Sequence, residues 1–143
     1  GAYLGGTGSA NYLDDYEEGT WTASVGGSSS GGSVSLGNTT GYYTKVGDLV
    51  HFFWYSGSST VTTAPTGSIR LEGLPYTVAS LSFGYSTFHY LHGNLFSQIT
   101  TGGYPNVGTT FAYFVIQGTV SASLTMNTGG GKYIMVSGTY RAA

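Results

Sequence analysis

The stretch GDLVHFFWYSG, residues 47–57, predicts a β-strand that carries bulky apolar side chains on both of its faces. Side chains alternate across a strand, so one face receives Val50, Phe52 and Trp54 and the other receives His51, Phe53 and Tyr55. A strand with one face in water has no need of aromatic rings on that face. The second face is therefore expected to pack on another subunit, to bind a ligand, or to lie under loops.

Shorter alternating segments surround this strand. The inward side chains are expected to be Trp21, Ala23 and Val25 in the segment 19–25, and Ile69 and Leu71 in the segment 67–75. Further strands are expected at 77–93, 94–100, 109–118, 119–126 and 132–140, with turn signals such as 103–106 and a glycine- and serine-rich loop at 26–33 between them. Frequent short strands predict an all-β fold, a jelly-roll-like β-sandwich of about eight short antiparallel strands.

The composition restricts the partners that this fold can have. Charged residues make up 7% of the chain, against about a quarter in an ordinary domain, and only four residues are Lys or Arg. A phosphate backbone needs several cationic contacts, so nucleic acid is not an expected partner. The chain has no cysteine, which excludes a thiolate nucleophile and cysteine-ligated zinc. No apolar run approaches the roughly 18 residues of a membrane span, so no membrane insertion is expected.

A surface with so few charges gives little repulsion between copies of the chain. We therefore favour a subunit interface for the second faces of the two strongly apolar strands, those within 47–57 and 109–118. The interface residues expected on these strands are Phe53, Tyr55, Phe111 and Tyr113.

Four of the six acidic residues lie together just before Trp21. They are Asp14, Asp15, Glu17 and Glu18. A glycosidase pair must face each other across a cleft, usually from separate elements, and these residues are nearly consecutive. Their spacing is not that of a calcium loop either. The favoured interpretation is structural: the carboxylates hold the chain at the start of the first long strand, and Trp21 anchors that strand in the core. No metal and no cofactor is expected.

Three other motif fragments carry no chemistry in this context. The histidines of the H-x-x-H pair, His89 and His92, point to opposite faces of a strand and are poor joint metal ligands. The G-x-S-x-G match at 27–31 has no helix after it, which a nucleophile elbow requires. The glycines at 129–131 lack the spacing of a phosphate loop.

Aromatic and amide residues in the second half of the chain are the best ligand-binding candidates. Sugar sites combine aromatic rings, which stack on the apolar face of the sugar, with a few polar groups that fix its orientation. The candidates are Tyr85, His89, Tyr90, Tyr104 and Asn106. Packing within the core or at an interface is the alternative role for the same residues.

Four segments resemble the C-terminal domains of phage tail-fibre and virion-appendage proteins. They are GGTGSANYLDDYEEGTWT (5–22), YYTKVGDLVHF (42–52), IRLEGLPY (69–76) and IMVSGTYRAA (134–143). The chain departs from that family at Ala23, where the family usually has proline, and its part 77–131 matches no family motif. The residues carried over are structural: Leu13 to Gly19 and Trp21 as the domain-opening element, with Tyr43, Gly47, Gly73, Leu74 and Pro75 at turns and packing positions.

The resemblance implies a trimeric jelly-roll-like head domain on a virion surface, with a host-surface polysaccharide as receptor. We expect this domain to be non-enzymatic. The resemblance also implies an opening segment at 1–18, a single head at 19–143, and an upstream fibre shaft or virion anchor, which agrees with the missing initial Met. A purely structural capsid or fibre decoration, or an extracellular filament subunit, is the alternative. A glycan-cleaving depolymerase is a third possibility; its carboxylates would have to be Asp48, Glu72 or the 14–18 cluster.

Overall fold

Every regular element of the computed structural model is a β-strand, among the residues it describes (2, 3, 5–8, 12, 13, 15–116 and 124–143). The strands are β1 (Ala2–Tyr3), β2 (Tyr12–Leu13), β3 (Tyr16–Thr22), β4 (Ser24–Gly27), β5 (Ser33–Ser35), β6 (Thr40–Val46), β7 (Leu49–Tyr55), β8 (Ser59–Thr63), β9 (Ile69–Glu72), β10 (Phe88–Gly93), β11 (Gly102–Pro105), β12 (Phe111–Val115) and β13 (Gly129–Arg141). The expected all-β, antiparallel class is confirmed, with more strands than the eight expected. This described part contains no helix with the length and apolar character of a membrane span.

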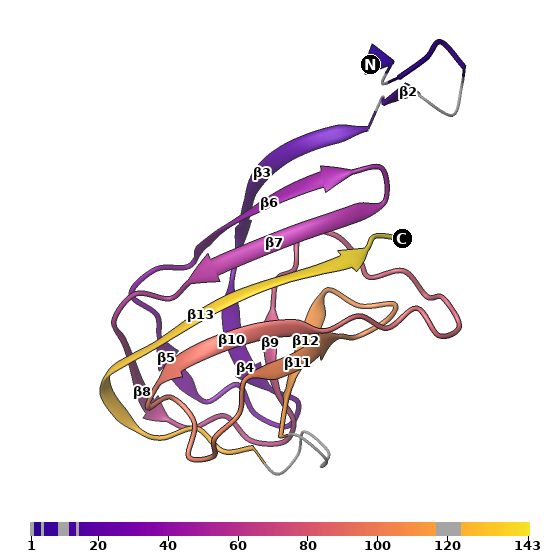
Figure 1. Ribbon diagram of the computed structural model, residues 1–143. Helices are drawn as coiled ribbons and strands as arrows, with labels where there is room; N and C mark the ends of the chain where they lie inside the picture. Colours follow the sequence, from indigo (N-terminus) through magenta and orange to yellow (C-terminus); the bar gives the residue numbers. More distant parts are fainter. Residues whose placement is uncertain (1, 4, 9–11, 14, 117–123) are drawn as a thin grey trace.

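The main sheet nearly closes on itself. Its order is β3-β6-β7-β13-β10-β11-β12-β9-β4, and each neighbouring pair is antiparallel. The first and last strands in this order, β3 and β4, are separated in the chain by Ala23 alone. Ala23 is fully buried, and its N–H donates a hydrogen bond of 2.8 Å to the carbonyl of Thr39. One extended segment therefore joins both edges of the sheet, which gives the barrel-like body in Figure 1.

Two pairs of strands lie outside this order, namely β5–β8 and β1–β2. Strand β13 is long enough to pair with β8 near its start and with both β7 and β10 farther along, and β5 pairs with β8. The short β1–β2 sheet extends away from the body beyond the start of β3 (Figure 1). Strand β3 begins at Tyr16, inside the segment 1–18 that was expected to precede the head; the domain boundary itself stays a prediction.

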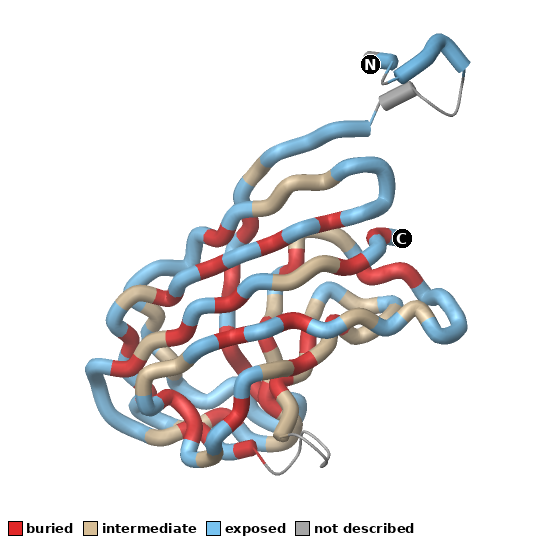
Figure 2. Tube along the Cα trace, viewed as in Figure 1, coloured by how far each residue is buried: buried red, intermediate tan, exposed pale blue. Residues whose placement is uncertain are grey.

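The core is built from aromatic rings on alternating strand positions. Strand β7 alternates between exposed and buried residues along its whole length, which confirms the two faces predicted for it. Trp21 from β3 meets Phe52 edge-to-face at 5.9 Å, and Phe88 meets Phe114 in the same way at 5.5 Å. Such contacts between rings stabilise the fold in addition to the effect of the apolar area that they bury. Figure 2 shows the buried positions alternating with exposed ones along the strands of the main sheet.

Several predicted boundaries are wrong. The segment 94–100 is not a strand, since only the bridge between Phe96 and Met126 forms there, and within 77–93 only Phe88–Gly93 is a strand. The predicted turn at 103–106 falls largely in β11, where a side chain at Gly103 would collide with the ring of Phe88 and a backbone carbonyl. Most of the strand expected at 119–126 lies outside the described residues.

Candidate functional site

Two aromatic surfaces stand on the outside of the sheet. The first, which we call the outer apolar face, is formed by half-exposed side chains of β6, β7, β10 and β13. Its members are Tyr42, Phe53, Tyr55, Leu91 and Met135. Strand register sets them in rows: Tyr42 is opposite Phe53, Tyr55 is opposite Met135, and Met135 is opposite Leu91.

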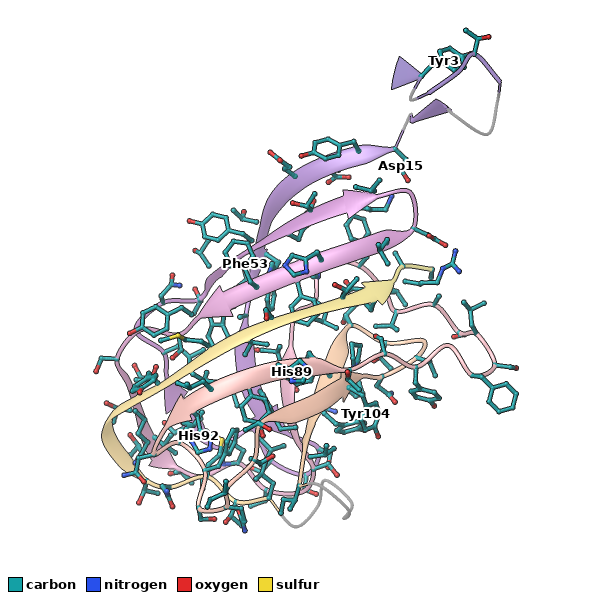
Figure 3. All side chains as sticks on the ribbon, viewed as in Figure 1. Tyr3, Asp15, Phe53, His89, His92 and Tyr104 are labelled. Carbon is teal, nitrogen blue, oxygen red and sulfur yellow. The ribbon has the colours of Figure 1, made fainter. Side chains whose placement is uncertain are left out.

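The outer apolar face has no acidic or basic residue among its members. The rings of Tyr42 and Phe53 stack at 5.5 Å with 25° between their planes. A shallow groove of about 700 Å³ runs over this face, and no Asp, Glu, Lys or Arg is among its lining residues. His89 reaches the groove from β10, two strands away from Phe53 (Figure 3). An uncharged, half-exposed sheet face of this kind is suited to contact with another apolar surface.

The second surface is an aromatic ladder, made of Tyr85, Tyr104, Tyr113 and Phe111. Tyr104 on β11 lies opposite Tyr113 on β12, with ring centres 5.6 Å apart. Tyr85, from the loop before β10, meets Tyr104 edge-to-face at 5.8 Å. Phe111 meets Tyr113 edge-to-face at 5.3 Å. The ladder therefore joins two residues predicted to bind ligand, Tyr85 and Tyr104, with two predicted for the subunit interface.

An ion pair between Arg70 and Glu72 lies beside Phe111 at one end of the ladder. Arg70 on β9 lies opposite Tyr113, and its guanidinium is 4.6 Å from the centre of the Phe111 ring. The same guanidinium donates to Glu72 at 2.5 Å. Burial, followed by the nearby Tyr113 and Tyr85, raises the pKa of the Tyr104 hydroxyl. This hydroxyl therefore stays protonated at neutral pH, where it can both donate and accept a hydrogen bond.

A groove of about 490 Å³ opens beside the ladder, between β10 and β11. Its lining includes Tyr104, His89, and Ile99, whose side chain is 97% exposed. Asn106, the last of the predicted ligand residues near here, is half-buried at the turn between β11 and β12. The groove gives the ladder a hollow next to the half-buried ring of Tyr104, and its lining includes Thr87 and Thr101. Thr100 also lines the groove, but its hydroxyl is bonded to Tyr90 and to the carbonyl of Val115.

Tyr90 is not an exposed member of either surface, although it is among the residues that line the groove over the outer apolar face. Its side chain is buried among core rings, 5.1 Å from Phe114 and 5.7 Å from Phe96, and its hydroxyl donates to Thr100 at 2.7 Å. Burial raises its pKa to about 12. His92, two residues on, points away from His89 and packs edge-to-face on Phe96 at 5.0 Å, so the two histidines face opposite sides as expected.

The acidic residues of the opening segment are tied to other side chains. Glu17 accepts hydrogen bonds from the hydroxyls of Tyr43 and Tyr76, which lower the pKa of its carboxyl group. Asp15 pairs with Lys45, and Glu18 accepts from Tyr16. Asp14 lies outside the described residues. Among the described residues no group of three or more His, Asp or Glu could hold a metal ion.

The residues that sequence reasoning missed are those whose role depends on register. Tyr42, Leu91 and Met135 complete the outer apolar face, and Arg70 caps the ladder. The one signal of these residues in the sequence is the alternation of side chains along a strand. Alternation indicates that they face outward, but it does not indicate which strands lie beside them.

The chain is similar to a phage protein. It is 29% identical over 94 residues to a protein named "Depolymerase, capsule KN4-specific" from Klebsiella phage K64-1, and the alignment covers 66% of this chain and 12% of that protein. No family model matches the chain, and no solved structure matches it significantly. The similarity supports a relation to bacteriophage proteins. Because the relative is named as an enzyme, the expectation of a non-enzymatic domain gains no support from it and stays a prediction.

Proposed function

We propose that this chain is a head domain of a phage virion appendage, which forms a homotrimer through its outer apolar face and binds a host-surface glycan through its aromatic ladder. The observation that carries the proposal is the presence of two unlike aromatic surfaces on one charge-poor body. The similarity to a phage depolymerase supports the phage setting and a location on the virion surface. An upstream shaft or anchor completes the proposed appendage.

The two surfaces differ in the ligands that they suit. The outer apolar face includes aliphatic side chains, Leu91 and Met135, beside its rings, and its groove has no charged residue in its lining. Such a face is suited to a dry contact with the same face or a neighbouring face of another copy. We therefore assign Phe53 and Tyr55 to the subunit interface, as the sequence pattern led us to expect.

The ladder is suited to sugar. Tyr85 is exposed and the other three rings are half-buried, so each can offer part of an apolar face to the C–H side of a pyranose. The three tyrosine hydroxyls can hydrogen-bond with sugar hydroxyls. We therefore move Phe111 and Tyr113 from the expected interface to the glycan site, together with Tyr85 and Tyr104. Three such sites on one rigid trimer would bind a repeating polysaccharide far more tightly than one site alone.

The arrangement of the carboxylates supports binding rather than cleavage. Glycoside hydrolysis needs two carboxyl groups that face each other across the bond to be cut. The described carboxylates each have a polar partner, namely Lys45 for Asp15, Tyr43 and Tyr76 for Glu17, Tyr16 for Glu18, Arg141 for Asp48 and Arg70 for Glu72. Neither groove described above has Asp or Glu in its lining.

The test combines mass and adsorption. Light scattering on the purified chain should give about 45 kDa, three times the 14.9 kDa of one chain. The labelled trimer should adsorb to encapsulated Klebsiella cells and not to matched capsule-free cells. A trimer that binds neither capsule nor cell of any strain tested would favour the purely structural alternative. A monomer at micromolar concentration would overturn the assembly.

A further inference from the structure

The basic residues of this chain are all engaged within the fold. The sequence has four Lys and Arg residues, and each of them is described by the structure. Lys45 pairs with Asp15, Arg70 with Glu72 and Arg141 with Asp48. Lys132 is buried, and its ammonium group donates to the carbonyl of Asn94 at 3.2 Å. The described surface therefore offers no unpaired ammonium or guanidinium group to an anionic ligand.

The ladder has one basic residue beside it, and its guanidinium is engaged by a carboxylate and by an aromatic ring. Arg70 donates to Glu72 at 2.5 Å and at the same time lies over the ring of Phe111. Of the other two ion pairs, the one between Asp15 and Lys45 lies at the end of the body far from Tyr104 (Figure 3). A carboxylate brought to the ladder would have to displace Glu72 or stand beside it unpaired.

The hydroxyl groups of the ladder complete the argument. Tyr104 has a raised pKa because of burial and its two tyrosine neighbours, so no charge develops on it at neutral pH. The groove next to it is lined by threonines, glycines and apolar residues, with His89 as its one titratable member besides Tyr104. Neutral donors and acceptors beside half-exposed rings match the hydroxyl groups and C–H faces of an uncharged sugar.

We infer that the glycan bound by the ladder is a neutral polysaccharide, built of uncharged hexoses rather than of uronic acids or other acidic sugars. The inference rests on the proposed function, because it names the ligand class of the same site. Since no ion pair forms with the ligand, binding is insensitive to salt. In the present sequence Glu72 acts as the residue that excludes acidic chains, by occupying the only guanidinium within reach.

The experiment uses matched polysaccharides. The intact chain is passed over immobilised polygalacturonate and over the same polymer after its carboxyl groups have been reduced to hydroxymethyl groups, together with dextran, mannan and galactan. We expect retention on at least one neutral polymer, equal at 50 and 500 mM NaCl, and none on polygalacturonate. Tyr104→Ala should weaken the retained interaction by about tenfold. Asp48→Asn, which frees Arg141 away from the ladder, should leave neutral retention unchanged.

A second variant tests the role of the ion pair. Glu72→Gln releases Arg70 and should bring measurable binding to polygalacturonate at 50 mM NaCl that disappears at 500 mM. A variant that folds, by its unfolding temperature, and still ignores the polyuronate would contradict the charge argument. Preferential binding of polyuronates by the unaltered chain would overturn the inference and leave the proposed function standing. If the chain is retained on no polymer but still adsorbs to capsule, the inference of a neutral ligand is also overturned. If the chain is retained on no polymer and does not adsorb to capsule, the proposed function is overturned.

Discussion

The hydroxyl of Tyr76 donates a hydrogen bond of 2.6 Å to the carboxylate of Glu17, across 59 positions of sequence. Tyr43 donates to the same carboxylate, and its ring meets that of Tyr76 edge-to-face at 5.5 Å. The backbone carbonyl of Tyr76 also accepts a hydrogen bond of 2.9 Å from the Tyr140 hydroxyl. The acidic opening element is thus joined to β6, to the loop after β9 and to β13. This connection gives Glu17 a structural role at the start of the first long strand.

Replacing Glu17 with Gln should lower the stability of the fold at neutral pH and remove part of its acid sensitivity. The two tyrosine hydroxyls lower the pKa of the Glu17 carboxyl below its ordinary value of 4.5. A carboxyl with a lowered folded-state pKa contributes stability above the unfolded value, and that contribution is lost as pH falls through the folded-state value. Unfolding temperatures between pH 7 and pH 3 measure it. Glu18→Gln is the control, and an equal effect from both variants would contradict the assignment.

His92 should make the protein less stable below neutral pH. Burial lowers the pKa of this imidazole from its ordinary value of 6.5, while a hydrogen bond to the Gln98 backbone acts in the opposite direction. Its Nδ1 atom is buried and has no hydrogen-bond partner among the residues that the structure describes. Because the unfolded chain binds the proton more tightly, the stability present above about pH 6.5 falls as pH decreases through the unfolded pKa.

The measurement for His92 is the slope of unfolding free energy between pH 8 and pH 5. His92→Phe keeps an aromatic ring against Phe96 and should flatten that slope, whatever its stability at pH 8. His89→Gln changes an exposed histidine on the opposite face of the same strand and should leave the slope as it is. An unchanged slope in His92→Phe would assign the acid sensitivity to another group.

Local pattern predicted much of the fold, because alternation is a local property. The buried positions of β7 and the inward Trp21, Ala23 and Val25 follow from side-chain period alone. The pattern gave wrong predictions where packing against residues distant in sequence determines the local structure. Gly103 indicated a turn, but it pairs with Phe114 in a strand. Glycine suits this position because the Phe88 ring and the Tyr113 carbonyl fill the space where a side chain would stand.

The candidate sites were predicted only as fragments. Tyr85, Tyr104 and Tyr113 had been divided between two roles, and they form one ladder because β11 pairs with β12 and the loop before β10 folds back on Tyr104. Tyr90 had been grouped with ligand residues, although alternation from His89 places it on the inner face. Pairing between strands distant in sequence is a global property, which periodicity does not contain.

Adding one methyl group at Gly138 should destabilise the core. A Cβ atom there would come within 2.5 Å of the Phe88 side chain and 3.0 Å of the Phe52 ring. Overpacking of this kind typically reduces the unfolding free energy by about 1–3 kcal/mol. Gly138→Ala should therefore unfold at clearly lower urea concentration. The matched control is Gly31→Ala, where nothing lies within 4 Å; equal midpoints for the two variants would contradict the packing described.

Phe83 should be replaceable with a gain in stability. Its side chain is fully exposed, and its φ of 61° lies in the left-handed region. That conformation costs an L-residue such as Phe roughly 1–2 kcal/mol, whereas Asn adopts it more readily. We expect Phe83→Asn to raise the unfolding free energy by up to about 1 kcal/mol in urea titrations. A loss of stability instead would show that the ring makes contacts that favour the folded state.

A charge placed on the outer apolar face should dissociate the proposed trimer. Phe53 is 48% exposed, stacks on Tyr42, and lies opposite Ser137 in the middle of the face. Phe53→Glu would bury three carboxylates in the assembly without partners, at a cost of several kcal/mol for each, so light scattering should report monomers. Its unfolding midpoint as a monomer should show that the fold persists, because this ring is outside the core. Phe83→Glu introduces the same charge at a fully exposed position of the loop before β10, which is not among the residues of this face, and should remain trimeric. If Phe53→Glu also stays trimeric with unchanged stability, the interface lies elsewhere on the molecule.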